Sequence, residues 1–279
     1  MNAGHGVTLL TLAAIASAAS PALAQAPSLP QPGSVFLEEL TWMEVRDAIA
    51  GGKTTVIIPT GGTEQNGPHI VLGKHNYLVK YKAGEIAARL GNALVAPVVA
   101  YVPEGDVDPP SGHMRYAGTI TTPQDVFMKV LEYAARSFKQ HGFLDVVLIG
   151  DSGGNQEGQR LVAAALNQEW AATPARVHHT TAYYPGRGDD WVVSQGVSAE
   201  DVGSHAGTHD TASLMYINPS MLRFDKMTVG KAGDGQGHVG NPAKATALFG
   251  RRILEMQIED ATMQIRELRV SSRRRAALR

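Results

Sequence analysis

Short runs of apolar and β-branched residues, separated by segments of helical length, constrain the fold of this chain most. They are TTVIIP at 54–59, ALVAPVVAY at 93–101 and DVVLI at 145–149, and a weaker fourth run follows at 176–183. Continuous apolar runs of this length are typical of strands buried on both faces, and strands that alternate with helices form parallel sheets covered by helices. The sequence therefore predicts an α/β fold, a three-layer sandwich with a mostly parallel β-sheet.

Helix start and stop signals occupy the segments between these runs. Thr41 and Glu44 form a capping box that opens a short helix. Asn76 is the expected N-cap of a helix that ends at Gly91, and further helices are predicted to begin near Pro123 and Asn155. An apolar stripe at four- and three-residue spacing predicts one more helix near the C-terminus, through Leu254, Ile258, Ala261, Ile265 and Leu268.

The two ends differ in composition from the rest of the chain. Residues 1–24 hold an apolar, Ala-rich run that ends in Ala-Leu-Ala, so they are predicted to be a signal peptide cut after Ala24, with a retained anchor as the alternative. Residues 25–35 form a Pro-rich linker, residues 36–270 the α/β domain and residues 271–279 a basic tail. We expect an exported protein, periplasmic or secreted, without stable membrane insertion.

Charge and residue usage exclude several kinds of partner and site. The 25 Lys and Arg residues against 26 Asp and Glu leave a formal net charge of -1, which argues against nucleic acid as a partner. The chain has ten His and no Cys, so a metal site must use imidazole and oxygen ligands. Disulfides and cysteine nucleophiles are excluded.

Ligands of open parallel sheets bind at the carboxyl ends of the strands, which directs attention to three loops. These are residues 60–76, 102–119 and 150–155, all rich in Gly, His and acidic residues. The loops contain the motifs GGTEQNGPH at 61–69, GKHN at 73–76, GHMRYAGTI at 112–120 and GDSGGN at 150–155, and HAGTHDTAS at 205–213 and GHVGNP at 237–242 follow.

Taken together and in this order, the motifs resemble those of the creatininase (creatinine amidohydrolase) family over about residues 36–262. The resemblance implies an amidohydrolase that acts on non-peptide C–N bonds, in which a metal-activated water attacks the carbonyl of a small, possibly cyclic amide. It also implies one or two divalent metals and a ring-shaped homo-oligomer, a hexamer in the family.

The chain departs from the family pattern at metal-binding positions. Asn66 and Ser152 stand where the family has His ligands, and His75 stands where an Asp bridges two metals. A carboxylate can bridge two cations, whereas a neutral imidazole offers one lone pair to one cation. We therefore expect one zinc, manganese or iron ion per chain.

The expected ligands of this ion are Glu64, His75 and Asp210, with Asp151 as a fourth group. His205, which is retained before Ala-Gly, is the expected general base or proton donor. Expected substrate contacts are Asn66, His69, His113, Arg115, Gly153, Gly154 and Asn155.

Two alternatives remain open. Ser152 lies in a strand–turn–helix setting and could act as a nucleophile with His205 as its base, which would make the protein a serine hydrolase. The altered ligands are also compatible with a non-catalytic binding protein on the same scaffold.

Overall fold

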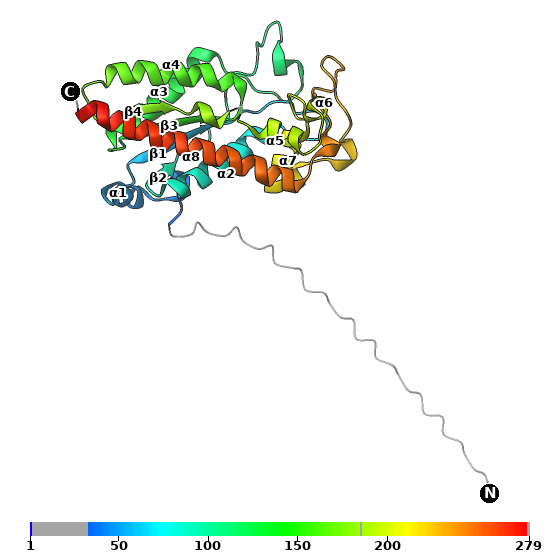
Figure 1. The fold of residues 1–279 in the computed structure, drawn as a ribbon, viewed down its shortest axis with the longest axis horizontal. Helices are drawn as coiled ribbons and strands as arrows, with labels where there is room; N and C mark the ends of the chain where they lie inside the picture. The colour runs from blue at the N-terminus through cyan, green and yellow to red at the C-terminus, as the bar shows by residue number, and fades with distance from the viewer. Residues whose placement is uncertain (2–32, 185, 278–279) are drawn as a thin grey trace. The chain divides into compact units, whose positions relative to one another are not determined.

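The computed structural model describes Met1, residues 33–184 and residues 186–277. Pro32–Arg279 is one compact unit by itself (Figure 1). The predicted signal peptide, apart from Met1, and most of the predicted linker lie outside the described residues.

A parallel sheet of four strands stands at the centre of the described part of this unit, in the order β2-β1-β3-β4. Its strands are β1 (Thr55–Thr60), β2 (Ala93–Val95), β3 (Asp145–Gly150) and β4 (Arg176–His179). Val56 pairs with Leu94 on one side and with Val146 on the other. Every residue of β1 and β3 is buried, which explains their uninterrupted apolar pattern.

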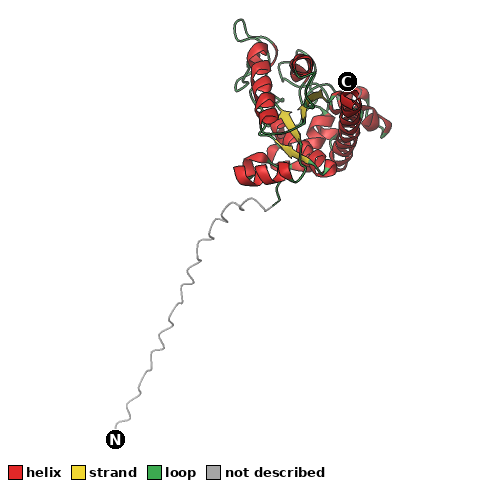
Figure 2. Cartoon of the chain, turned by 90° about the vertical axis from the view of Figure 1, so that its left-hand side faces the viewer, coloured by secondary structure: helices red, strands yellow, loops and turns green. Residues whose placement is uncertain are grey.

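Helices cover both faces of the sheet, so the unit has three layers (Figure 2). One face carries α2 (Lys74–Leu90), α7 (Thr208–Ile217) and α8 (Ala247–Ala277). The other face carries α1 (Trp42–Ala50), α3 (Gln124–Gln140) and α4 (Gly153–Glu169). The short helices α5 (Gly188–Ser194) and α6 (Ala199–Val202) pack near α7 and α8. The predicted three-layer α/β architecture is thereby confirmed.

Successive residues of β1 point to opposite faces of the sheet and fill two separate cores. Ile57 packs with Val79 of α2 and Ile258 of α8. Its neighbour Val56 packs with Phe127 of α3 on the other face. The predicted C-terminal stripe belongs to the first core, because four of its five residues are buried there: Leu254, Ile258, Ala261 and Ile265.

Several predicted boundaries differ from the observed ones for physical reasons. The Thr41–Glu44 capping box is present in both directions. The prediction that Asn76 caps its helix was wrong, because α2 begins at Lys74 and Asn76 Oδ1 accepts the backbone N–H of Gly62 instead, at 3.1 Å. Strand β2 stops after three residues, just before Pro97, which has no N–H to donate to a sheet.

Helix α8 continues as far as Ala277, so most of the predicted basic tail is helical. Within the described ranges, none of the helices combines the length and the apolarity that crossing a membrane requires.

A buried ion network around Asp145 joins the amino end of β3 to α8. Asp145 Oδ1 lies 2.8 Å from His178 Nε2, and its Oδ2 accepts a hydrogen bond from Arg269 Nε at 3.1 Å. Arg269 also donates to Asn92 Oδ1 at 2.9 Å. Arg273, one turn further along α8, lies 3.8 Å from Asp145 and its side chain is 62% exposed.

We expect Arg269→Met to lower the free energy of unfolding by about 2–3 kcal/mol, because it leaves the buried Asp145 carboxylate and the Asn92 amide without this donor. Urea unfolding measures the change. Arg273→Met is the matched control and should leave the free energy of unfolding nearly unchanged. Equal losses in the two variants would contradict this account of the network.

Candidate active site

A cleft of about 550 Å³ opens at the carboxyl ends of β1 and β3, where a parallel sheet is expected to bind its ligand. Its walls come from the loops that follow β1, β2 and β3 and from the segment that leads into α7. The titratable side chains that line it are Glu64, Lys74, His75, Lys82, Glu104, His113, Asp151, Tyr184, Asp189, His205, His209 and Asp210.

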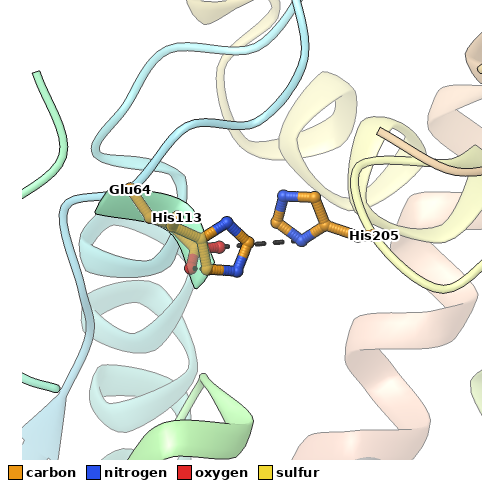
Figure 3. Close-up of side chains that lie close together, drawn as sticks. All are labelled: Glu64, His113 and His205. Carbon is orange, nitrogen blue, oxygen red and sulfur yellow. Dashed lines mark ion pairs between the residues drawn. The ribbon is translucent and has the colours of Figure 1, made fainter. Parts of the chain in front are cut away.

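Glu64, His113 and His205 converge at this cleft from three different loops (Figure 3). Glu64 Oε2 lies 3.2 Å from His113 Nε2, and Glu64 Oε1 lies 3.7 Å from His205 Nδ1. Among the described residues, they form the group whose donor atoms lie close enough together, within 4.8 Å, to hold a metal ion. One carboxylate with two imidazoles is a donor set that catalytic zinc uses.

Gln65 orients both imidazoles. Its Oε1 accepts the backbone N–H of Gly67 at 3.0 Å, so its Nε2 is the group that faces His113 Nδ1 at 2.9 Å. Its backbone carbonyl lies 2.9 Å from His205 Nε2, and we assign the ring proton of His205 to this contact. Burial lowers the pKa of His205 to about 4, so at neutral pH its Nδ1 lone pair is directed towards Glu64.

The residue after His205 has an unusual backbone conformation. Ala206 has a φ of 51°, in the left-handed region, and its N–H donates to Asp210 Oδ2 at 2.7 Å. A Cβ atom on the next residue, Gly207, would lie 2.2 Å from the carbonyl oxygen of Val202. Asp210 therefore helps to hold the strained turn that presents His205.

His75 lies between two carboxylates. Its Nε2 is 2.8 Å from Glu64 Oε1 and its Nδ1 is 2.9 Å from Asp151 Oδ2. Burial and the charge of Lys74 oppose protonation, but Glu64 and Asp151 raise the pKa of His75 above its usual value. With a proton on both nitrogens, the imidazolium has no lone pair for a metal.

Two buried lysines pair with the remaining acids. Lys74 Nζ lies 2.8 Å from Asp210 Oδ2, and Lys82 Nζ lies 2.5 Å from Asp151 Oδ1. Burial favours the neutral form of Asp151, but Lys82 and His75 lower its pKa to about 2. Burial also favours the neutral forms of Glu64 and Asp210. The neighbouring cations outweigh burial and lower the pKa of both carboxyl groups.

The network of ionised groups is therefore balanced. Three carboxylates, those of Glu64, Asp151 and Asp210, face three cations, those of Lys74, His75 and Lys82. Glu104 does not add to the negative charge, because burial and the nearby charge of Glu64 raise the pKa of Glu104 to about 10. At neutral pH Glu104 is a protonated acid in the cleft wall.

The predicted substrate contacts divide into three groups. His113, Gly153 and Gly154 line the cleft. A second group is buried and holds the loops together: Asn66, His69 and Asn155. Asn66 Nδ2 donates to Glu64 O at 2.9 Å, and Asn155 Nδ2 donates to Thr60 Oγ1 at 2.8 Å. His69 Nε2 lies 3.0 Å from Ala206 O. Arg115 is exposed and contacts Pro110 O at 3.4 Å.

Ser152 is the N-cap of α4. Its Oγ accepts the backbone N–H of Gly154 at 3.4 Å. In the part of the chain that the structure describes, no imidazole lies within hydrogen-bonding distance of this oxygen. The geometry that a serine nucleophile needs is therefore not formed here.

Sequence reasoning missed four residues of the site. Gln65 orients the two imidazoles, and Lys74, Lys82 and Glu104 determine the charge balance of the site. A signal for the lysines was present, because Lys74, Leu78 and Lys82 recur every four residues and so share the buried face of α2. His209 also lines the cleft, and its Nδ1 lies 2.5 Å from Asp189 Oδ1.

Comparisons with known proteins identify the family of this fold and site. The family model described as creatinine amidohydrolase matches residues 38–265, so the chain belongs to the creatininase family. A mycofactocin precursor peptide peptidase from Mycolicibacterium smegmatis is 26% identical over 234 residues, which cover 76% of this chain and 84% of the relative.

Solved creatininases share the fold. A tryptophan-to-alanine mutant of creatininase superposes with a TM-score of 0.72 at 20% identity, covering 85% of this chain and 99% of its own. A glutamate-to-glutamine mutant described as the Zn-Zn type gives a TM-score of 0.66 at 21% identity, covering 84% of this chain and 98% of its own.

We expect His75→Gln, measured in chelator, to lower the free energy of unfolding by about 3 kcal/mol at pH 5.5, because it leaves two buried carboxylates without their shared cation. A group whose pKa is raised by folding stabilises the fold only while it is protonated. The difference from the unsubstituted chain should therefore be largest below pH 6.5 and shrink as the pH rises.

Urea unfolding at pH 5.5, 7.5 and 9.5 measures this difference. His141→Gln, at the exposed C-cap of α3, is the matched control and should leave the stability nearly unchanged at every pH. A loss in His75→Gln that stays constant across the range would show that His75 is not a buried imidazolium.

Proposed function

We propose that this protein hydrolyses the C–N bond of a small amide in the cleft, using one divalent metal held by Glu64, His113 and His205. The observation that carries the proposal is the convergence of one anionic carboxylate and two imidazoles at the carboxyl end of a parallel sheet. Membership of a family of amidohydrolases supports the same chemistry.

The residues fit one metal ion at this position. Glu64 is ionised, and His205 presents an unprotonated nitrogen. His113 Nε2 would exchange the proton that it shares with Glu64 for the metal, as histidine ligands do when they bind. Of the four ligands predicted from the sequence, the proposed ligand set keeps Glu64. The other three, His75, Asp151 and Asp210, take part in the ion network instead.

The residues do not fit a pair of metal ions like that of the Zn-Zn creatininase. Asn66 donates its amide protons to backbone carbonyls, and Ser152 caps a helix. His75 has both nitrogens on carboxylates. Asn66 Oδ1 has no hydrogen-bond partner among the described residues, but Asn66 is fully buried and lies outside the lining of the cleft, so it is poorly placed to bind a second ion there.

A bound divalent metal would supply Lewis acidity, which polarises a carbonyl and lowers the pKa of a bound water to about 7. Glu104 is the protonated acid beside Glu64, and we assign it the proton that a leaving nitrogen requires. His209 also lines the cleft, and we assign a ring proton to its 2.5 Å contact between Nδ1 and Asp189 Oδ1.

The size of the cleft favours a small substrate. A volume of about 550 Å³ is in the range of small-molecule sites. One relative is named as a precursor peptide peptidase, which supports peptides as a second class of candidate substrate. Small lactams and linear amides are therefore the first compounds to screen, and short peptides are the second.

Metal content and turnover test the ligand set together. The purified protein, reloaded with zinc or manganese, should hold about one equivalent per chain, and Glu64→Gln or His205→Gln should lose both the metal and any amide hydrolysis, by at least about 100-fold in kcat/KM. His141→Gln is the control that keeps both. Full metal content and turnover in Glu64→Gln would contradict the proposal.

Ser152→Ala separates this function from the serine hydrolase alternative. The variant should lose about 1 kcal/mol of stability, because an N-cap is removed, but keep its metal and its turnover. Loss of turnover with normal metal content would instead favour Ser152 as the nucleophile. Unchanged behaviour of all variants in every amide assay would favour a binding protein.

A further inference from the structure

Of the two buried lysines, Lys74 is the one that lies near the proposed metal ligand Glu64. Its side chain, at the first residue of α2, is only 1% exposed although it lines the cleft. Its Nζ lies 2.8 Å from Asp210 Oδ2 and 3.9 Å from Glu64 Oε1. The ammonium therefore stands between the carboxylate of α7 and the carboxylate that follows β1.

Asp151, a third ionised acid of the cleft, is similarly paired. Asp151 Oδ1 accepts hydrogen bonds from Lys82 Nζ at 2.5 Å and from the Tyr183 hydroxyl at 2.7 Å. Its Oδ2 faces His75 Nδ1 at 2.9 Å. Each carboxylate that could serve a second metal ion is thus already neutralised by a cation that belongs to the chain itself.

We propose that the Lys74 ammonium is a built-in replacement for a second metal ion, and that it limits this protein to one metal per chain. The inference rests on the proposed function only in assuming that one metal ion is bound by Glu64, His113 and His205. A divalent cation bound to Asp210 would lie within about 5 Å of Nζ, where two positive charges in a buried site repel each other strongly. The ammonium and a second metal therefore exclude one another.

Removing the ammonium alone should create a cation site. Lys74→Met keeps a long side chain of similar shape but leaves three carboxylates facing two cations. Asp210 then lines the cleft without its cationic partner and, of its donors in the described part of the chain, keeps only the backbone N–H of Ala206. A buried negative excess of this kind favours uptake of a cation. Lys74→Arg retains the positive charge and should not open the site.

The experiment counts zinc per chain by elemental analysis after loading and dialysis, on the full chain and three variants. We expect Lys74→Met to hold one equivalent more than the unsubstituted protein. Lys74→Arg and Lys80→Met should match the unsubstituted protein, since Lys80 lies on the exposed side of the same helix. The Tm of Lys74→Met should also rise with added zinc more steeply than that of the other chains.

The Tm series keeps the test decisive if Lys74→Met is poorly folded without metal, because zinc would then restore its folding transition. Two equivalents in the unsubstituted protein would overturn the proposal. So would a Lys74→Met variant with no additional zinc and no zinc-dependent Tm. The expected gain of one zinc in Lys74→Met does not depend on how much zinc the unsubstituted protein holds. If the unsubstituted protein held no zinc and Lys74→Met held one, the proposed catalytic metal would be contradicted but the role of Lys74 would stand.

Discussion

The pairing of buried charges at the carboxyl end of the sheet is the constraint on which the rest of the site depends. His75 binds a carboxylate at each ring nitrogen, Glu64 after β1 and Asp151 after β3, so it ties the two central strands to α2. Lys74 extends the network to Asp210 of α7. A buried ion that lost its partner would be strongly unfavourable, so these groups must keep their positions together.

This network determines which side chains remain for chemistry. With His75 paired to two carboxylates and with Asp151 and Asp210 paired to lysines, Glu64 still faces His113 and His205 across the cleft. Gln65 and the strained turn at Ala206 then fix the two imidazoles. A buried ion network fixes the positions of its side chains even where it adds little to the free energy of unfolding, and a metal site requires ligands in fixed positions. The result is a creatininase-family site with the means to hold one ion and with fixed ammonium groups beside it.

Much of the fold could be predicted from the sequence, because buried parallel strands and helix caps leave local patterns, as in β1, β3 and the Thr41–Glu44 box. The location of the site followed from the same topology. The roles of its residues did not, because they depend on contacts between distant segments. Asp210 was an expected ligand, yet its partner Lys74 lies 136 positions away in the sequence. The protonation of His75 depends in the same way on acids from two different loops.

Anomalous diffraction from crystals soaked in zinc, recorded at the zinc absorption edge, tests the central claim most directly. The account predicts one anomalous peak per chain, bounded by Glu64, His113 and His205, with Lys74 still paired to Asp210. A second peak between Asp210 and His75, or a single peak at that position with the triad empty, would contradict it.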